Sequence, residues 1–500
     1  MSFKRYSDRE IDYKVMVSIK AKTDVEYRRT RSAHWNAVAK RFDHWKGAGG
    51  LYHRRMTEVY RFLVPPGQKV LEIGCAQGDL LSALKPAIGI GVDFSSEMLE
   101  RARKRHPEIF FVLADAHELI LAGSKESTEF DIIILSDLLN DLWDVQVVLE
   151  QISQYCTPRT RIIINNYSRL WEIPLGLAKC LRLAKPTLSQ NWLQLKDVLN
   201  LLCLADFEII RSWPEFLWPL PIPLVKSFFN RFLVKFWPFR WFALSNFIVA
   251  RPRPEKGIRA PQPRVSVSIP ARNESGNIAK IFARVPELGS GTELVFVEGH
   301  SKDDTYAEIE RQIAAHPKRR CRLIRQTGIG KGDAIRLGFT HASGDILMIL
   351  DADLTVPPED LSRFYEALIE GKGEFINGTR LVYPMEKQAM RFFNLLGNKF
   401  FCLAFSWLLG QPVRDTLCGT KALWKKDYES IARNRTYFGD FDPFGDYDLL
   451  FGAARLSLKI IDLPIRYRER TYGTTNIQRW KHGWLLFKMV IFAAARIKFV

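Results

Sequence analysis

Short, unbroken apolar runs recur along the chain and are separated by longer segments that mix apolar and polar residues. Such runs are typical of strands buried in a parallel sheet, and the mixed segments are typical of amphipathic helices. Seven runs lie in the first half, at 69–73, 88–92, 109–113, 130–135, 161–165, 207–213 and 245–250. Four lie in the second half, at 265–269, 294–298, 321–325 and 346–350. Strand–helix alternation in both halves predicts an α/β protein of two domains.

The clearest domain boundary is the stretch RPRPEKGIRAPQPR at 251–264, which is proline-rich, basic and without apolar periodicity. Such composition is typical of an extended linker. We therefore predict a first domain at 1–253, a linker at 254–264 and a second domain at 265–500. Residues 1–60 are polar with scattered aromatics, and we interpret them as padding on a core in preference to a cap over a pocket.

The last run of the second half ends in Asp351-Ala352-Asp353. Alternate strand positions point the same way, so both carboxylates can face one point at the strand's carboxyl end. Two acids there are costly unless a cation lies between them. A hard divalent ion that carries a diphosphate is the simplest candidate, so Asp351 and Asp353 are predicted to bind Mg²⁺ or Mn²⁺. A solvated turn is the alternative. A helix is predicted to begin at 357–359.

In the first half, the run at 69–73 enters a turn with Gly74 and Gly78, where the backbone can approach a ligand closely. The second run ends at Asp93, which is placed to accept hydrogen bonds from two ribose hydroxyls. Asp115 and Ala116 follow the third run, where an adenine edge could be bound.

From 69 to 254 the chain resembles a class I S-adenosylmethionine-dependent methyltransferase, which implies a seven-stranded Rossmann-like sheet and that cofactor. The resemblance places Glu72, Gly74, Cys75 and Gly78 on the loop for the methionine part, with Ala76 as a mild departure. The methyl acceptor is not identified. Asp137, His34 and His117 are candidate bases, and a structural role is preferred for each.

From 264 to 484 the chain resembles a family 2 glycosyltransferase of the GT-A fold, in the group of dolichol-phosphate mannose synthase and bacterial polyprenyl-phosphate glycosyltransferases. The matching residues are Pro270, Ala271, Asn273 and Glu274, then Gly330, Lys331 and Gly332, then Asp351 and Asp353, Gly378 and Arg380, Asp415 and Gly419, and Arg470, Gly473 and Thr475. The resemblance implies that the first three groups bind the nucleotide sugar. In place of the family's usual V-D-D-G-S, this chain has Glu298 as the first acid and Gly299 at the position of the second. The second acid helps to recognise the nucleobase, so the sequence does not decide between a uracil and a guanine nucleotide. Asn476 replaces a usual lysine.

Charge decides the expected mechanism. A divalent ion on Asp351 and Asp353 neutralises the leaving diphosphate without proton transfer, and Lys331 assists. A polyprenyl phosphate acceptor is already ionised and needs only a cationic cradle, for which we predict Arg380, Arg470 and Arg466. A hydroxyl of a saccharide or lipid-linked sugar would need a base, and Asp446 or Asp448 are then the candidates. Otherwise these two are acids at a helix start.

Composition also indicates that the protein binds a membrane surface. The net charge is +18, and the insert at 214–242 mixes Trp, Phe and Pro with Lys226, Arg231, Lys235 and Arg240. Apolar segments around 390–410 and at the C-terminus are interrupted by polar residues, which suits helices that lie in the interface. Packing against the second half is the alternative for the insert, and core burial or oligomer contact for the others.

These features predict a bifunctional, inverting enzyme on the inner face of the cell membrane, with an anionic bilayer and no nucleic acid among its partners. The seven cysteines lack metal or disulfide spacing and suit a reducing compartment, and the charged start MSFKRYSDREIDYKV is no signal peptide. Two alternatives stay open. Methylation could cap a glycan made by the second domain, or the first domain could bind its cofactor only to regulate.

Overall fold

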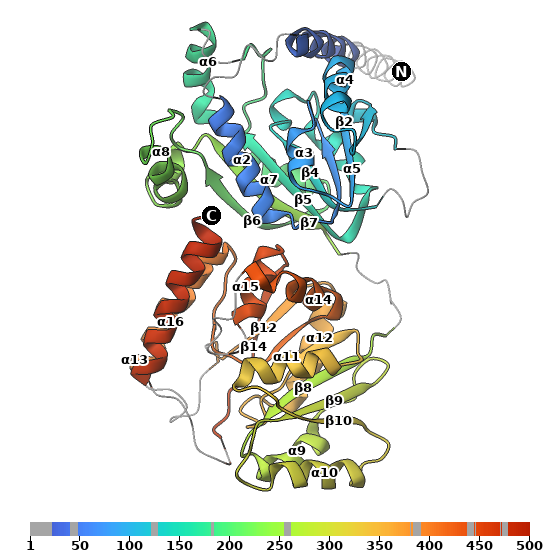
Figure 1. The fold of residues 1–500 in the computed structure, drawn as a ribbon, viewed down its shortest axis with the longest axis vertical. Coiled ribbons are helices and arrows are strands. Elements are labelled where there is room, and N and C mark those ends of the chain that lie inside the picture. Colours follow the sequence, from blue (N-terminus) through green and yellow to red (C-terminus); the bar gives the residue numbers. More distant parts are fainter. Residues whose placement is uncertain are drawn as a thin grey trace, which may run out of the picture. The chain divides into compact units, whose positions relative to one another are not determined.

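The computed structural model describes residues 23–40, 49–121, 129–181, 185–254, 262–380, 382–383, 392–437, 445, 447–470, 472 and 479–500. The chain forms two compact units, Met1–Arg253 and Pro254–Val500, and each is built on its own sheet of seven strands (Figure 1). The predicted α/β fold class is confirmed. Most of the predicted linker, 255–261, lies outside the described residues.

The first unit has the strand order β3-β2-β1-β4-β5-β7-β6, in which β7 runs antiparallel to both of its neighbours and the other pairs are parallel. Every apolar run predicted in the first half is one of these strands. They are β1 (Lys69–Ile73), β2 (Ile88–Asp93), β3 (Phe110–Leu113), β4 (Phe130–Ser136), β5 (Cys156–Tyr167), β6 (Phe207–Glu215) and β7 (Ser245–Pro252).

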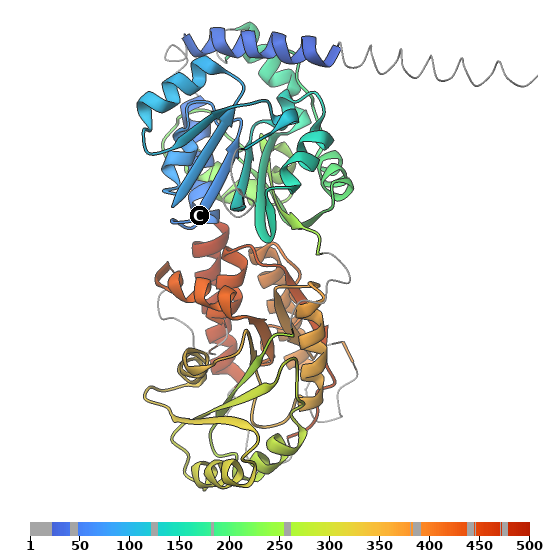
Figure 2. The ribbon, with the colours of Figure 1, turned by 90° about the vertical axis from the view of Figure 1, so that its right-hand side faces the viewer.

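Helices cover both faces of this sheet (Figure 1). They are α2 (Gly49–Leu63), α3 (Asp79–Ala83), α4 (Ser96–Arg105), α5 (Val145–Ser153), α6 (Glu172–Cys180), α7 (Leu195–Leu204) and the short α8 (Val225–Ser227). Local sequence explains their starts. The Ser95 side chain caps α4 by accepting from Met98 N, and Asp144 caps α5 by accepting from two backbone amides. Residues 23–40 form a further helix, which lies across one end of the first sheet (Figure 2).

The aromatic-basic insert differs from its prediction in two ways. The strand β6 continues through Glu215, so residues 214–215 pair with β7 and belong to the sheet. Lys235, predicted as a surface cation, is buried in an ion pair with Glu215, which also pairs with Arg55 at 3.2 Å. A buried carboxylate needs cationic partners, so Lys235 anchors the insert to the sheet and does not face solvent.

The second unit has the strand order β10-β9-β8-β11-β13-β12-β14, with β13 antiparallel to both neighbours. The four predicted runs are β8 (Val265–Ala271), β9 (Thr292–Glu298), β10 (Arg320–Arg325) and β11 (Ile346–Ile349). Three further strands, β12 (Phe375–Thr379), β13 (Lys421–Trp424) and β14 (Ile460–Pro464), were not predicted. Each is short and carries a polar residue such as Asn377 or Lys421, so no apolar run marks it.

The helices of the second unit are α9 (Ser275–Arg284), α10 (Thr305–Ala315), α11 (Lys331–His341), α12 (Leu361–Ile369), α13 (Phe392–Leu409), α14 (Lys425–Arg433), α15 (Tyr447–Arg455) and α16 (Arg479–Ala493). The helix predicted to begin at 357–359 starts as a 3₁₀ turn, Pro358–Asp360, that leads into α12. The apolar α13 and α16 pack against each other (Figure 1). Within the described parts of the chain, no helix combines the length and apolar character that crossing a membrane requires.

Candidate functional site

The two acids of the second unit lie just beyond the carboxyl end of β11. The strand ends at Ile349, and Leu354 N bonds Asp351 O at 3.3 Å, so Asp351 and Asp353 stand in a turn. The predicted strand alternation therefore does not orient them. Instead, cationic side chains do: Lys331 Nζ lies 2.6 Å from Asp351 Oδ1, and Arg470 Nη2 lies 2.6 Å from Asp353 Oδ2.

Arg470 joins acids from two neighbouring strands. Its Nη1 lies 3.7 Å from Glu274 Oε1, and Asn277 Nδ2 donates to Glu274 Oε2 at 2.8 Å. Burial raises the pKa of Glu274, and Asn277 and Arg470 partly offset that rise. The loop after β8 and the turn after β11 are therefore held around one guanidinium at the carboxyl edge of the sheet, where α/β proteins bind ligands.

Glycines bring backbone close to this site. Lys331 is the first residue of α11, and a Cβ on Gly332 would stand 2.8 Å from Gly445 Cα. A Cβ on Gly419 would collide with both Asp351 Oδ2 and Lys331 Nζ. The Lys331–Asp351 pair is therefore bordered by bare backbone, and a helix N-terminus beside it favours negative charge.

Several positive charges act on Asp351. Burial would raise its pKa, but Lys331, Lys421 and Arg380 together hold the pKa below its ordinary value, so the carboxyl is ionised at neutral pH. Lys421 was not singled out from the sequence. Arg380 is bound by Asp415, through Nε to Oδ2 at 2.7 Å and Nη2 to Oδ1 at 2.8 Å, so two of the predicted motif residues meet directly.

The donor set suits a divalent ion shared with a ligand. Within the described residues no group of three His, Cys, Asp or Glu side chains could hold a metal by itself. Mg²⁺ is commonly held by one or two carboxylates together with substrate phosphates and water. Asp351 and Asp353 supply those carboxylates, and because Gly419 has no side chain, Asp351 Oδ2 and Lys331 Nζ can lie against its backbone. The residues present therefore fit a metal that arrives with a diphosphate.

The predicted nucleotide loop is braced against the loop after β9. Pro270 and Ala271 end β8, and Glu298 ends β9. Asn273 Oδ1 accepts from Lys302 N at 2.7 Å, and Glu298 Oε1 accepts from Ser301 N at 2.5 Å. Asn273 and Glu298 thus shape the two loops, and the structure gives them no contact with Asp351 or Lys331.

The two acids predicted as alternative bases have different outcomes. Asp448 stands in the first turn of α15, where its Oδ2 lies 3.1 Å from Arg435 Nε and 3.8 Å from Arg336 Nη1. These ion pairs favour the helix-start role over that of a base. Asp446, Gly473, Thr475 and Asn476 lie outside the described residues. Arg466 is exposed, with its guanidinium 5.2 Å from the Tyr383 ring centroid.

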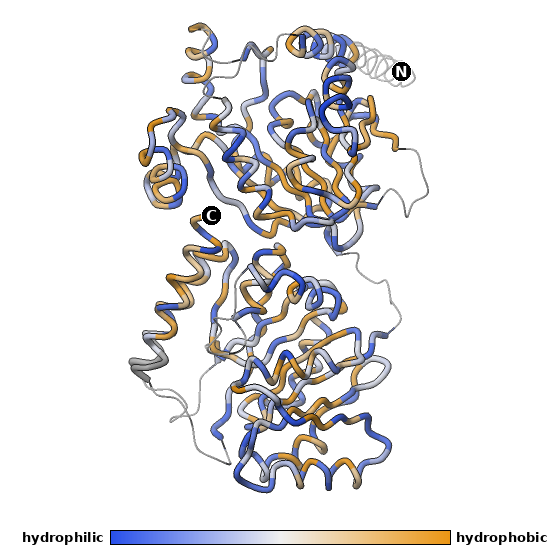
Figure 3. Tube along the Cα trace, in the orientation of Figure 1, coloured by the Kyte–Doolittle hydropathy of each residue, from blue (hydrophilic) through white to orange (hydrophobic). Residues whose placement is uncertain are grey.

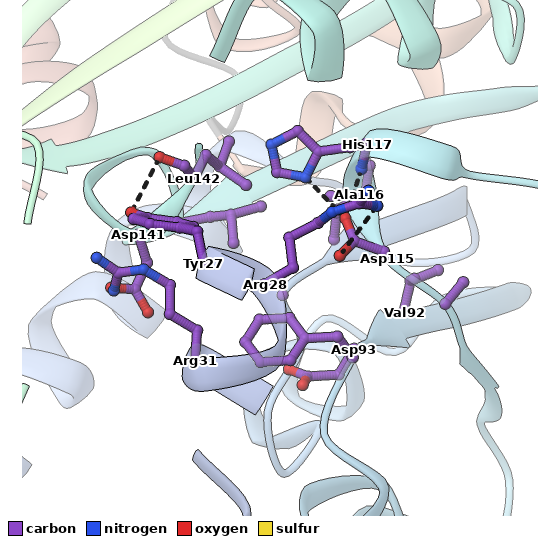
Figure 4. Close-up of a pocket in the computed structure, with 15 residues that line it drawn as sticks. Tyr27, Arg28, Arg31, Val92, Asp93, Asp115, Ala116, His117, Asp141 and Leu142 are labelled. Carbon is purple, nitrogen blue, oxygen red and sulfur yellow. Dashed lines mark hydrogen bonds and ion pairs between the residues drawn. The ribbon is translucent and has the colours of Figure 1, made fainter. Parts of the chain in front are cut away.

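The first unit contains an open pocket at the carboxyl ends of β1 to β4 (Figure 4). Four of the seven predicted cofactor residues line it: Gly74, Asp93, Asp115 and Ala116. The remaining lining residues are Tyr27, Arg28, Arg31, Ile73, Val92, Phe94, Ala114, His117, Leu138, Asp141 and Leu142.

Two backbone amides fix the orientation of the Asp93 carboxylate at the end of β2. Its Oδ2 accepts from Ala76 N and its Oδ1 from Ser95 N, both at 2.9 Å. Burial raises the pKa of Asp93 to about 6, although both amides oppose that rise. A carboxylate has about four acceptor positions, so two hydroxyl donors can still bind it. Gly74 and Leu138 lie close together in the pocket lining, because a Cβ on Gly74 would stand only 2.8 Å from Leu138 Cδ1. These residues fit the ribose and methionine parts of S-adenosylmethionine.

The other three predicted cofactor residues do not line the pocket. Glu72 and Cys75 are buried, and Gly78 turns the backbone into α3 with φ of 74° while the Phe111 ring occupies the place of a side chain. All three therefore belong to the packing that shapes the loop, and they do not line the pocket.

Glu72 predicts a pH dependence of stability. Burial raises its pKa to about 8 from 4.5, so the folded unit keeps a proton that the unfolded chain releases. Its contribution to stability is fully present below pH 4.5 and is lost as pH rises through 8, with a total effect on the order of a few kcal/mol. Urea unfolding of Glu72→Gln should show a smaller loss between pH 5 and pH 8 than the wild type.

The matched control is Glu150→Gln on the exposed face of α5, which should keep the wild-type profile. A Glu72→Gln variant that loses as much stability as the wild type over this range would show that Glu72 does not carry the proton.

The helix at 23–40 supplies pocket residues that the sequence did not reveal. Arg28 Nη1 pairs with Glu118 Oε1 at 2.8 Å and lies 3.8 Å from Asp115 Oδ2, while Arg31 pairs with Asp141. Trp35 Nε1 also donates to Asp141, at 2.5 Å. Figure 4 shows Arg28, Arg31, Asp115 and Asp141 around the pocket. The expectation that this segment only pads a core was wrong, since its charged face meets acids on the pocket rim.

Comparisons with known proteins match a different family in each unit. Residues 266–429 match the model of the family described as glycosyl transferase family 2, and residues 65–204 match one described as a methyltransferase domain. Undecaprenyl-phosphate 4-deoxy-4-formamido-L-arabinose transferase of Klebsiella pneumoniae is 31% identical over 236 residues, which are 46% of this chain and 67% of that protein. The predicted family resemblances are confirmed in both units.

Dolichol-phosphate mannosyltransferase of Pyrococcus furiosus is 30% identical over 220 residues, which are 43% of this chain and 59% of that protein. The chain thus spans roughly three fifths to two thirds of these two relatives. Among solved structures, a S-adenosylmethionine-dependent methyltransferase of Thermotoga maritima covers 44% of this chain and 98% of its own, at 17% identity and a TM-score of 0.33.

Proposed function

Because the chain belongs to glycosyl transferase family 2 through its second unit and carries a methyltransferase domain in its first, we propose that it is bifunctional. The second unit transfers a sugar, with inversion, from a UDP- or GDP-sugar to a polyprenyl phosphate. The first unit, residues 1–253, transfers a methyl group from S-adenosylmethionine. The observation that carries the sugar transfer is the contact of Lys331 with Asp351 and of Arg470 with Asp353 beside the bare backbone of Gly419.

Charge explains how these residues would act. Departure of a nucleoside diphosphate builds negative charge on its phosphates, and a divalent ion held by Asp351 and Asp353 would supply neutralising charge. Lys331 contacts Asp351 from the N-terminus of α11, so its ammonium and the helix end both favour an anion there. Arg470 fixes Asp353 while bracing Glu274 of the nucleotide loop.

The described residues favour a phosphate acceptor over a hydroxyl. A hydroxyl needs a base, and Asp448 is engaged by Arg435 and Arg336. A phosphomonoester needs only cations, and the candidates are Arg466, which is exposed, and Arg470, which is half-buried beside Asp353. Both relatives described above are named for transfer to a lipid phosphate. The test is release of nucleoside diphosphate from a panel of UDP- and GDP-sugars: it should depend on added polyprenyl phosphate, and release that ignores the lipid argues against the proposal.

A lipid acceptor calls for contact with a bilayer, and the first unit exposes a suitable face. We define the aromatic surface as the exposed side chains of residues 220–242 and of α6. Leu224 is 85% exposed, Trp237 71% and Ile173 of α6 75%. Trp171 Nε1 donates to Phe242 O at 2.9 Å, so the two segments adjoin. Large exposed apolar patches mark interaction sites, and Lys226 and Arg240 on this one suit anionic lipid.

The second unit also exposes apolar helix faces. Leu403 of α13 and Trp484 of α16 are exposed, and both helices are largely hydrophobic (Figure 3). Lys498 Nζ donates to Trp407 O at 2.7 Å and ties the chain end to α13. Helices that are too short to cross a bilayer can lie in its interface with their apolar side inward. We propose a peripheral location on the cytoplasmic face of the cell membrane.

Flotation tests this location. The full chain should float with vesicles that contain an anionic lipid, and less at high salt because the basic side chains are screened. Phe228→Ser with Trp241→Ser should lower the membrane partition coefficient by about 100-fold or more, since each buried aromatic contributes about 1.5–3 kcal/mol. The control is Ile120→Ser, which removes a side chain that is 81% exposed outside the aromatic surface. If the double variant floats like the wild type, this surface does not bind membrane.

A further inference from the structure

A polar cluster lies at the carboxyl ends of β4 and β5, beside the first-unit pocket but outside its lining residues. Asp137 follows β4 with φ of 53°, a left-handed conformation that Asp tolerates better than most residues. Its Oδ1 accepts from Tyr52 Oη at 2.7 Å and from Asn165 Nδ2 at 2.6 Å. Tyr60 Oη donates to Asn165 Oδ1 at 2.7 Å and so orients the amide. The carboxyl is therefore held in a fixed orientation by three elements, α2, β4 and β5.

The strand order places this cluster next to the reacting end of the cofactor. Asp115 follows β3, Asp93 ends β2 and Gly74 follows β1, so the proposed adenine, ribose and methionine contacts run along the sheet as β3, β2, β1. The next strand in that order is β4, which is followed by Asp137, and the neighbouring Leu138 packs on Gly74. The methyl group would therefore be delivered toward Asp137, Asn165 and Tyr52.

The charge of the cluster suits proton acceptance near neutral pH. Burial raises the pKa of Asp137 to about 7, against the opposing effects of Tyr52, Tyr167, Asn165 and the Lys185 ammonium. Lys185 also interacts with Asp79, and burial lowers its pKa to about 8. Burial and Lys185 lower the pKa of His53 to about 4, so this ring is neutral. A base is most effective when its pKa lies near the working pH.

We propose that Asp137 is the general base of the methyltransferase unit and that the methyl acceptor is a hydroxyl group; this rests on the methyl transfer proposed above. The acceptor oxygen gives its proton to an Asp137 carboxylate oxygen and bonds to the methyl carbon, as the sulfur–methyl bond of S-adenosylmethionine breaks with its electron pair left on sulfur. A carboxylate acceptor has no proton to lose and would be repelled by Asp137. An ammonium acceptor has no free electron pair with which to attack the methyl carbon.

The first test needs no cofactor and compares Asp137→Asn with Asp131→Asn, a matched change at the opposite end of β4. Asp131 Oδ2 accepts from Lys69 N, which an Asn oxygen can also do. Because the pKa of Asp137 is raised on folding, its contribution to stability is present below pH 3.8 and is lost as pH rises through 7. Between pH 5 and pH 8, the melting temperature of the wild type should therefore fall relative to that of Asp137→Asn. The difference in melting temperature between the wild type and Asp131→Asn should stay constant over the same range. Equal pH profiles for wild type and Asp137→Asn overturn the proposal.

The second test supplies S-adenosylmethionine labelled in its methyl group, with methyl glycosides of common hexoses and a glycolipid fraction as hydroxyl-bearing probes. The label should enter an ether that survives alkali. Asp137→Asn should lower the rate by about 10²–10⁴-fold and Asp131→Asn should not, because general bases contribute that range. Label found only in an alkali-labile ester, or a wild-type rate in Asp137→Asn, overturns the proposal.

Calorimetric titration with S-adenosylmethionine separates the two claims. A wild-type chain that does not bind the cofactor refutes methyl transfer itself. Binding that is equal in the wild type and Asp137→Asn, with transfer lost only in the variant, is the expected result for a base.

Discussion

Asp351→Asn and Asp353→Asn should each lower sugar transfer by about 10³-fold or more, since a metal ion contributes several kcal/mol of charge stabilisation in the transition state. The amide keeps the shape of the carboxylate but not its charge, and a hard divalent ion prefers charged oxygen. The measurement is the rate of nucleoside diphosphate release under saturating Mg²⁺ or Mn²⁺.

The matched control is Asp345→Asn on the same segment, just before β11. Asp345 Oδ2 accepts from Arg264 N at 3.0 Å, and an Asn oxygen keeps that bond, so the variant should transfer at the wild-type rate. Asp353→Asn also loosens Arg470 from Asp353, so it should weaken nucleotide-sugar binding more than Asp351→Asn does. Full activity in both site variants would remove the metal assignment.

Gly419→Ala should lower transfer about 10²-fold while the second unit stays folded. The added methyl group would collide with Asp351 Oδ2 and Lys331 Nζ, which are the ends of flexible side chains and can move without disturbing the core. Their movement displaces the two charges that the diphosphate needs, and small misplacements of catalytic groups are costly.

The control for this change is Gly397→Ala on α13, where an added Cβ meets nothing within 4 Å. It should leave transfer unchanged. Thermal unfolding of both variants separates a lost site from a lost fold, and an active Gly419→Ala would mean that the space beside Asp351 is not used.

The sequence predicted the strands that are continuous apolar runs, because burial on both faces leaves a clear pattern, as in β4 and β8. It also predicted acids and glycines that follow parallel strands, such as Asp93 and Gly74, because parallel strands collect their carboxyl ends at one edge of the sheet. Strands with a polar residue, such as β13, carry no comparable pattern. The same limit applies to the helix at 23–40, where no motif marks the face that meets the pocket.

Pairings between distant segments could not be predicted. Arg470 and Asp353 are 117 residues apart, and Tyr52 and Asp137 are 85 apart, so nothing local links them. Lys235 was predicted at the surface, because a basic residue among aromatics suits a headgroup layer. Its burial depends on Glu215, twenty residues earlier, whose charge must be matched inside the unit.

The most direct test of the central claim is mass spectrometry of the lipid products formed from a polyprenyl phosphate and a panel of UDP- and GDP-sugars. One product is expected, whose mass equals the lipid phosphate plus one sugar residue, with the sugar released by mild acid as expected for a glycosyl phosphate. The product should be missing with Asp351→Asn and present with Asp345→Asn. A sugar that is attached to a hydroxyl, with the lipid phosphate unchanged, would contradict transfer to the phosphate.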